Sequence, residues 1–459
     1  MHKIDFKKPI HIYFMGIGGI SMSGLAEILL KEQFQVSGSD AKSSDIIDRL
    51  TQMGVTVYIG QRASNITDDI DLVVYTAAIK KDNLEFEACV KKGIPMITRA
   101  QLLGQIMSNY KYPIAISGTH GKTTTTSMLT QILLEADTDP TITVGGILDC
   151  INGNICVGKS DYFVAEACEY TNSFHEFHPY ISIILNIEAD HLDFFSGIEE
   201  IIDSFQGFAR KLPDDGLLII NGDMDCLERV TKDLKTNITT FGLQPFNHYS
   251  ATDIVTNEQG HIQYTLVVDG TSAETVMLNV GGSHNVLNSL STLAVSDALG
   301  ISRATAISGL GGFCNAKRRF EYKGSLKDIT IIDDYAHHPT EIKATLATAK
   351  NTLHNELWVV FQPHTYTRTK ALLNDFAEAL HGFDHVILTD IYAAREKNTG
   401  KIHSKDLMEQ IKNYGTDVHY FSSFDLVEKF LLENCKKNDL LITMGAGDVV
   451  SIGEHLLGK

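Results

Sequence analysis

The segment Ser117–Thr126 places the tightest constraint on how this 459-residue chain can fold. It reads Ser-Gly-Thr-His-Gly-Lys-Thr-Thr-Thr-Thr and follows the apolar run 112–116. Apolar residues then recur at helical spacing: Met128, Leu129, Ile132 and Leu133. The glycines therefore sit between a predicted buried strand and an amphipathic helix. Such a turn points the free N–H groups of the first helical turn, and the positive end of the helix dipole, at one spot that favours an anion.

The residue types in this turn predict a loop that binds a nucleoside triphosphate. Gly118 and Gly121 let the main chain approach an anion, and Lys122 can reach terminal phosphates. The hydroxyl of Thr123 or Thr124 can ligate a magnesium ion. The commoner loop has one more glycine, at the position of Ile116 here, so this is a shorter form. The alternative is a glycine-rich turn with a solvated lysine.

A second glycine-rich turn lies near the N-terminus. The predicted strand 11–15 leads into Gly16-Ile17-Gly18-Gly19-Ile20-Ser21, which resembles a dinucleotide fingerprint with serine in place of its third glycine. A second predicted strand ends at Ser39 and Asp40, where an acid can accept a hydrogen bond from a ribose hydroxyl. This turn alone also fits a nicotinamide dehydrogenase or a purely structural turn.

Apolar strands alternate with helical stretches along most of the chain, which predicts an α/β fold with parallel sheets. Polar residues follow many of these strands, and parallel sheets bind ligands at that edge. Thr76 follows one strand near the N-terminus, and the alternation predicts the end of a first domain near residue 108. Further strand-like pieces occur at 216–220, 239–241 and 263–268.

Two strand ends beside the phosphate loop carry candidate metal ligands. Glu166 ends the apolar strand 162–165, and 181–185 leads into Asn-Ile-Glu-Ala-Asp-His-Leu-Asp. A carboxylate there can hold Mg²⁺. His191 is an unusual magnesium ligand, and the alternative is a histidine held by Asp190 or Asp193.

Later polar clusters could also address a ligand. Asn285 and Asn288 are three apart at a helix start, so they share one face, although one could simply cap the helix. A run of three cations, 317–319, is flanked by phenylalanines and could contact phosphate or remain solvated. Arg368 and Arg395 follow strands in the last 140 residues and could clamp a carboxylate or be ordinary surface residues.

Composition narrows the function further. The formal net charge of −18 argues against general binding to nucleic acid or to membrane surfaces. No apolar run approaches the ~20 residues that span a bilayer, and the start of the chain lacks a signal peptide's apolar region. The seven cysteines show no Cys-x-x-Cys spacing, so we expect buried thiols in a reducing cytoplasm.

The motifs together resemble those of the Mur ligases over nearly the whole chain. The resemblance is carried by Gly-Ile-Gly-Gly, GTHGKTTTT, Glu166, NIEADHLD, GGSHNVLN, Arg-Arg-Phe at 318–320, DDYAHHPTE and QPHTYTRT, in the family's order. It implies three domains: a Rossmann-like domain for a UDP-sugar at 1–108, a central ATP-binding α/β domain at 109–320, and a Rossmann-like domain for an amino acid at 321–459. Two departures are Cys168, where the family usually has aspartate, and Thr365, where many relatives have arginine.

The resemblance also implies site residues. Those for the UDP-sugar are Gly16, Gly18, Gly19, Ser21, Ser39, Asp40 and Thr76. Those for ATP are Gly118, Thr119, His120, Gly121, Lys122, Thr123, Thr124, Asn285, Asn288, Arg319 and Asp334. Those for the amino acid are Tyr335, His364 and Arg368. The metal ligands are Thr123, Glu166 and His191, and the catalytic residues are Lys122, Glu166, His191 and Arg319.

The activity implied is ATP-driven, Mg²⁺-dependent ligation of L-alanine to the lactyl carboxylate of UDP-N-acetylmuramate, in peptidoglycan precursor synthesis. The implied protein is a cytoplasmic monomer or homodimer. One alternative joins a tripeptide to the same nucleotide sugar during wall recycling, although the stretch 364–368 favours a single amino acid. A dehydrogenase accounts only for the first 110 residues and leaves the phosphate loop unused.

Overall fold

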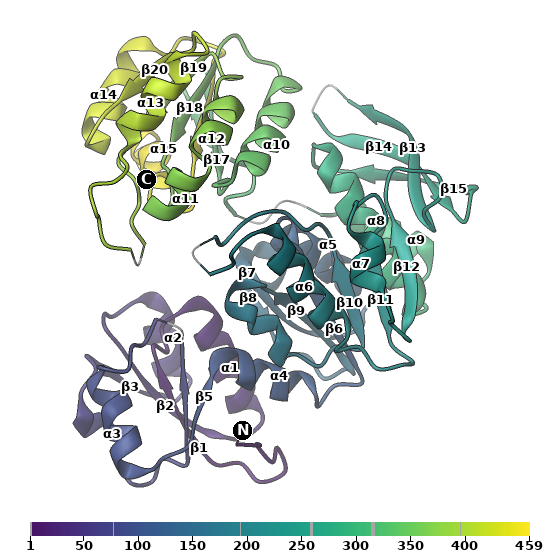
Figure 1. The fold of residues 1–459 in the computed structure, drawn as a ribbon, viewed down its shortest axis with the longest axis vertical. Helices are drawn as coiled ribbons and strands as arrows, with labels where there is room; N and C mark the ends of the chain where they lie inside the picture. The colour runs from purple at the N-terminus through teal and green to yellow at the C-terminus, as the bar shows by residue number, and fades with distance from the viewer. Residues whose placement is uncertain (1, 77, 193, 258–259, 314–316, 395) are drawn as a thin grey trace.

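The described residues form three β-sheets, each covered by helices (Figure 1). The computed structural model describes residues 2–76, 78–192, 194–257, 260–313, 317–394 and 396–459. Asp193 and Arg395, both named above, lie outside these residues. Each sheet falls within one of the three predicted domain ranges, and the α/β fold class is confirmed.

The N-terminal sheet is parallel and has the strand order β3-β2-β1-β4-β5. Its strands are β1 (His11–Met15), β2 (Gln35–Asp40), β3 (Thr56–Ile59), β4 (Leu72–Tyr75) and β5 (Met96–Thr98). The helices are α1 (Ile20–Lys31), α2 (Asp45–Gln52), η1 (Ala63–Asn65), α3 (Leu84–Lys92) and α4 (Arg99–Met107). The strand order reverses at β1, because β2 lies on one side of it and β4 on the other. The glycine turn after β1 therefore lies at a topological switch point, where such sheets bind ligands.

The central sheet has ten strands in the order β15-β14-β13-β12-β11-β10-β6-β9-β7-β8. They are β6 (Tyr112–Ser117), β7 (Thr141–Leu148), β8 (Gly153–Cys156), β9 (Tyr162–Ala167), β10 (Ile181–Ile184), β11 (Leu217–Asn221), β12 (Asn237–Phe241), β13 (Tyr249–Thr256), β14 (Ile262–Val268) and β15 (Thr271–Leu278). Its helices are α5 (Lys122–Glu135), η2 (Asp149–Ile151), η3 (Tyr170–Glu176), α6 (Ile198–Ala209), α7 (Leu227–Thr231), α8 (Ser283–Ala298) and α9 (Arg303–Gly311). Because β6 pairs in parallel with both β9 and β10, the segments that follow these three strands meet at one edge.

The C-terminal sheet has the order β16-β17-β21-β18-β19-β20, with β16 antiparallel. Its strands are β16 (Glu321–Leu326), β17 (Ile329–Asp334), β18 (Leu357–Phe361), β19 (His385–Leu388), β20 (Asp417–Tyr420) and β21 (Leu440–Met444). Its helices are α10 (Pro339–Lys350), α11 (Tyr366–Ala371), α12 (Leu373–Leu380), α13 (Ser404–Lys412), α14 (Phe424–Asn434) and α15 (Val450–Leu456). The chain's single tryptophan, Trp358, is buried in β18. Its indole N–H donates to Asp439 at 3.0 Å, and its ring stacks on His385 with centroids 3.8 Å apart.

The helix predicted after the phosphate loop packs as its periodicity requires. Met128, Leu129, Ile132 and Leu133 are all fully buried in the core on one face of the central sheet. Burial of such side chains is worth about 1.5–3 kcal/mol each. The first residue of α5 is therefore held firmly at the sheet edge.

The N-terminal and central units are joined by direct contacts. Asn154 donates to the Ile20 carbonyl at 2.9 Å, and the Lys31 ammonium donates to the Val157 carbonyl at 3.1 Å. Gly104 of α4 lies so close to η3 that an added Cβ would sit 1.9 Å from the Glu176 carbonyl oxygen. Only glycine fits there without a shift of the backbone.

Two expectations are tested by the remaining features. The six cysteines within the described residues are free thiols, but only Cys89 is fully buried and Cys150 is exposed, so the expectation of general burial was wrong. No helix among the described residues has the length and apolar character needed to cross a membrane.

Candidate active site

The phosphate loop joins β6 to α5 and is shaped by its two glycines. Gly118 has φ +143° and Gly121 has φ +85°, values that L side chains rarely adopt. A Cβ on Gly118 would meet the Leu185 side chain at 2.9 Å, and one on Gly121 would meet the Asn288 amide oxygen at 2.9 Å. The loop therefore needs glycine at both positions.

Asn186, which follows β10, fixes the path of this loop. Its side chain accepts from the His120 N–H at 2.8 Å and donates to the His120 carbonyl at 3.0 Å. Its carbonyl accepts from the Thr119 N–H at 3.1 Å. The N–H groups of Thr119 and His120 thus donate to Asn186, in the segment after β10, and do not face a ligand.

Lys122 is partly buried and is paired with an acid that was not predicted from the sequence as a site residue. Its ammonium donates to the Gly118 and Thr119 carbonyls and lies 3.1 Å from the Glu169 carboxylate. Burial alone would lower the pKa of Lys122, but the nearby negative charges, chiefly Glu169, reverse this and raise it. The Lys122 ammonium is therefore positively charged and can bind a phosphate group.

The predicted metal ligands lie around this pair. His191 adopts φ +52°, and its Nε2 lies 3.6 Å from Glu169 Oε1 and 3.8 Å from Asp190. Burial lowers the pKa of His191, which favours the neutral ring that a metal requires. Thr123, Lys122 and His191 line one cavity of about 120 Å³. Glu166 points its carboxylate at the Gly145 N–H, at 2.6 Å.

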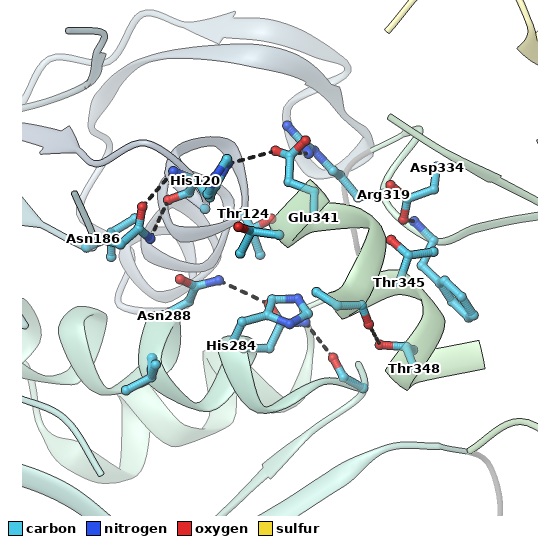
Figure 2. A pocket seen from close by; sticks show the side chains of 18 of the residues that line it. His120, Thr124, Asn186, His284, Asn288, Arg319, Asp334, Glu341, Thr345 and Thr348 are labelled. Atoms are coloured by element: carbon cyan, nitrogen blue, oxygen red, sulfur yellow. Dashed lines mark hydrogen bonds and ion pairs between the residues drawn. The ribbon is translucent and has the colours of Figure 1, made fainter. Parts of the chain in front are cut away.

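A larger cavity of about 330 Å³ opens beside the loop, between the central sheet and α10 (Figure 2). It is lined by many of the residues predicted for ATP: His120, Gly121, Thr124, Asn285, Asn288, Arg319 and Asp334. The predicted common face of α8 is confirmed, because Asn288 donates to Asn285 at 3.2 Å. The remaining wall comes from α10, including Glu341, Thr345 and Thr348.

Arg319, just before the border between the central and C-terminal units, and Asp334, at the end of β17, both reach this cavity. Arg319 lies 3.9 Å from Glu341, and its guanidinium is 5.3 Å from the Tyr335 ring centre. Asp334 accepts from the N–H groups of Phe320 at 3.0 Å and Ala336 at 2.7 Å. Burial raises the pKa of Asp334 to about 6.

The neighbouring Arg318 has a different role. It pairs with Asp333 at 2.9 Å and donates to the carbonyls of Gly447 and Gly445 at 3.0 and 2.7 Å. Arg318, one of the three cations in the run 317–319, therefore links β17 to the loop after β21. Arg319 alone of these two lines the cavities.

A third cavity, of about 150 Å³, separates the segment after β10 from α11. Arg368 and His364 line it, and Arg368 contacts the Asp190 carboxylate at 3.0 Å across the domain boundary. This pairing holds the pKa of Asp190 well below its usual range, although burial opposes it. Tyr335, the other residue predicted for the amino acid, is not among the cavity's described lining residues and instead lies beneath Arg318 and Arg319.

Several of the residues predicted to bind a UDP-sugar form hydrogen bonds with one another. Gly16, with φ +82°, donates its N–H to the Ser39 carbonyl at 2.8 Å, and Gly18 donates to the Asp40 carboxylate at 2.9 Å. Gly19 leads into α1 as its N-cap. The Ser39 hydroxyl is fully buried and donates to Glu85 at 2.6 Å. The Ser39 side chain therefore stabilises the glycine turn from the buried side and does not face solvent.

The last two of these residues are Ser21, in the first turn of α1, and Thr76, which follows β4. Ser21 accepts from Arg99 at 2.9 Å, and the Thr76 hydroxyl accepts from the Ala78 N–H at 3.0 Å. Arg99 was missed by the sequence analysis, because a cation in the first turn of a helix carries no local signal for a site. Its position beside Ser21 adds a cation to the glycine turn.

Three acids were also missed as site residues. Glu169 pairs with Lys122, Glu341 contacts His120 at 3.3 Å, and Glu188 lies 3.6 Å from the same imidazole. Both Glu188 and Glu341 stand inside motifs quoted above, NIEADHLD and DDYAHHPTE. The signal was present as motif membership, but nothing local identified their partners.

Comparison with known proteins places this site in a family. Residues 11–111 match the model described as Mur ligase family, catalytic domain, residues 116–296 the Mur ligase middle domain, and residues 318–447 the Mur ligase, glutamate ligase domain. The chain therefore belongs to the Mur ligase family.

Individual relatives are more specific. A protein of Agathobacter rectalis named UDP-N-acetylmuramate–L-alanine ligase is 56% identical over 459 residues, covering all of both chains. The crystal structure of the UDP-N-acetylmuramate-alanine ligase MurC of Thermotoga maritima is 28% identical, with a TM-score of 0.82 and 98% of both chains covered. A murein peptide ligase of Psychrobacter arcticus is also 28% identical over 98% of both chains, with a TM-score of 0.73.

Proposed function

We propose that this protein joins L-alanine to the lactyl carboxylate of UDP-N-acetylmuramate at the expense of ATP. The observation that carries the proposal is the convergence of three cavities on one edge of the central sheet. His120 and Arg319 line both the large cavity and the one that holds Lys122, and His191 lines both the latter and the small cavity of Arg368. The full-length relative named for this activity supports it.

The chemistry requires two anions to meet. The lactyl carboxylate attacks the γ-phosphorus of ATP, which releases ADP and forms an acyl phosphate. The amine of L-alanine then attacks the acyl carbon and phosphate leaves. Repulsion between carboxylate and triphosphate must be neutralised, and the partly buried cation Lys122 and the cavity-lining Arg319 are placed to do so.

The residues present fit a magnesium ion. Glu169 Oε1 is buried and forms no hydrogen bond within the described part of the chain, and His191 Nε2 lies 3.6 Å from it. With Thr123 and Glu166 nearby, these groups offer the oxygen-rich set that Mg²⁺ prefers. Bound Mg²⁺ would neutralise phosphate charge.

Contacts between the central and C-terminal units assemble the site. Glu188 accepts from Thr340 at 2.6 Å, and Asp190 pairs with Arg368 at 3.0 Å. Arg319 is thereby held on the wall of the cavity whose opposite side is the phosphate loop. We infer that domain closure completes the site, and that substrates enter and leave when these contacts open.

The cavity lined by Arg368 and His364 favours a single amino acid over a tripeptide. Its volume is about 150 Å³, and Leu192, Ala371 and Leu372 supply apolar walls suited to a methyl side chain. Arg368 can bind the amino acid's carboxylate if it exchanges Asp190 for it. The second candidate, ligation of a peptide, retains support from the murein peptide ligase of equal identity.

We propose that the UDP-sugar binds at the glycine turn after β1, beside Ser21 and Thr76. The remaining proposals are a cytoplasmic location, a monomer or homodimer, and domain borders after residues 108 and 320. None of them affects the chemistry above.

The test is ADP release with UDP-N-acetylmuramate, Mg-ATP and a panel of amines that includes L-alanine, glycine, L-serine and a tripeptide. We expect L-alanine to be used best and Lys122→Ala to abolish ADP formation while UDP-sugar binding survives. Lys343→Ala, at an exposed lysine paired with Glu378, is the control and should be fully active. Near-normal turnover in Lys122→Ala would refute the mechanism, and preference for the tripeptide would favour the second candidate.

A further inference from the structure

A group of three side chains that could bind a metal ion lies beside the phosphate loop. One potential ligand atom each from His120, Glu188 and His338 lies within 4.8 Å of the others. His120 belongs to the loop, Glu188 follows β10, and His338 caps α10 of the C-terminal unit. In the function proposed above His338 has no part, and Glu188 lines the large cavity and contacts Thr340.

His120 is oriented as a metal-binding histidine is. Its Nδ1 donates to the partly buried Glu341 carboxylate at 3.3 Å (Figure 2). Its Nε2 is buried, forms no hydrogen bond within the described residues, and lies 3.6 Å from the Glu188 carboxylate. Although burial opposes them, Glu188 and Glu341 raise the pKa of His120 to about 9, so an ion that binds Nε2 displaces its proton while Glu341 fixes the ring through Nδ1.

The other two ligands are held in place by the backbone and by α10. The rings of His120 and His338 lie with centroids 4.7 Å apart. His338 makes two long hydrogen bonds within the described part of the chain, to the Ala189 carbonyl at 3.3 Å and from the Thr340 N–H at 3.4 Å. Glu188 accepts from the Thr340 hydroxyl at 2.6 Å, which steadies the carboxylate as an outer partner of a ligand would.

We propose that His120, Glu188 and His338 form a binding site for a divalent transition-metal ion that ties the phosphate loop to the start of α10. Two imidazoles and one carboxylate suit Zn²⁺, Co²⁺ or Ni²⁺ rather than Mg²⁺, which prefers oxygen ligands. Three protein ligands leave a fourth position for water. Because His338 comes from the C-terminal unit and the other two from the central unit, the ion holds the closed arrangement without nucleotide.

The experiment is calorimetric titration of the full chain with Zn²⁺ in excess Mg²⁺ and no nucleotide, repeated with Co²⁺ while its visible absorption is recorded. We expect one Zn²⁺ site in the wild type. In both His338→Gln and Glu188→Gln the affinity should fall by more than about tenfold, because loss of a group that only supports a ligand already has an effect of that size. Hydrogen exchange in the first turn of α10 should slow when Zn²⁺ is added to the wild type and remain unchanged in both variants.

Two controls separate this site from others. His419→Gln alters a partly exposed cluster in which His419 contacts Asp417 at 3.0 Å, and it should bind Zn²⁺ normally. His191→Gln alters the proposed magnesium site and should also leave Zn²⁺ binding intact. The proposal is overturned if the wild type binds no Zn²⁺, or if His338→Gln and Glu188→Gln bind it as tightly as the wild type does. Circular dichroism of each variant excludes misfolding, and two independent ligand variants guard against a local defect in one.

Discussion

Replacing Glu169 by glutamine should destabilise the nucleotide-free phosphate loop far more than the same change at a surface ion pair. Glu169 is 2% exposed and Lys122 is 16% exposed, with 3.1 Å between their charged atoms. Removing one partner of a buried pair leaves the other charge uncompensated, at about 3–5 kcal/mol. Lys122 keeps hydrogen bonds to the Gly118 and Thr119 carbonyls, which reduces the expected loss to about 2–4 kcal/mol.

The chain provides a control that differs mainly in burial. Lys343 and Glu378 are also 3.1 Å apart, but their side chains are 50% and 54% exposed. Exposed pairs contribute about 0.2–1 kcal/mol, so Glu378→Gln should have little effect. The two variants make the same chemical change at the same distance.

Hydrogen exchange of α5 amides measures the loss locally, which is appropriate because a chain of several domains does not unfold in one step. We expect faster exchange in Glu169→Gln without nucleotide, and recovery in saturating ATP because phosphate then becomes the partner of Lys122. Equal exchange in α5 for Glu169→Gln and wild type, or no recovery with ATP, would show that the pair does not prepare the loop.

Three further changes have defined outcomes. Arg319→Ala should reduce ADP release by roughly 10³-fold or more, as for other arginines at phosphoryl-transfer sites, with UDP-sugar binding intact; unchanged turnover would mean that the side chain is merely solvated. Gly104→Ala places a methyl group 1.9 Å from the Glu176 carbonyl oxygen and should lower stability by about 1–3 kcal/mol, seen as a lower thermal midpoint. Burial raises the pKa of Asp334 to about 6, so the folded protein holds this proton more tightly than the unfolded chain. The free energy of unfolding should therefore fall by about 2–3 kcal/mol between about pH 4 and pH 6, relative to Asp334→Asn measured in parallel; parallel pH curves for the two proteins would contradict this.

Local patterns in the sequence predicted what the backbone determines. Strand ends, the glycine loop, the buried face of α5 and the shared face of Asn285 and Asn288 all follow from spacing along one element. The strands β7, β8, β13, β15, β16 and β20 were not predicted, because they are partly exposed and carry no long continuous apolar run.

Side-chain partners were harder to predict because they depend on distances set by the tertiary fold. Lys122 and Glu169 are 47 positions apart, and Arg368 and Asp190 are 178 positions apart. Ser39 was predicted at a binding edge, yet its hydroxyl faces buried Glu85, which comes from a helix 46 positions later. No periodicity within one segment reports such pairs.

The position of Trp358 gives the C-terminal unit a built-in optical label. No other tryptophan occurs in the chain, so ultraviolet emission excited at the red edge of the protein band comes from β18 alone. The indole is stacked on His385, whose two ring nitrogens contact Asp417 at 2.7 Å and Glu356 at 3.2 Å. Its brightness and wavelength should follow the melting of this unit separately from the other two, without any dye or engineered probe.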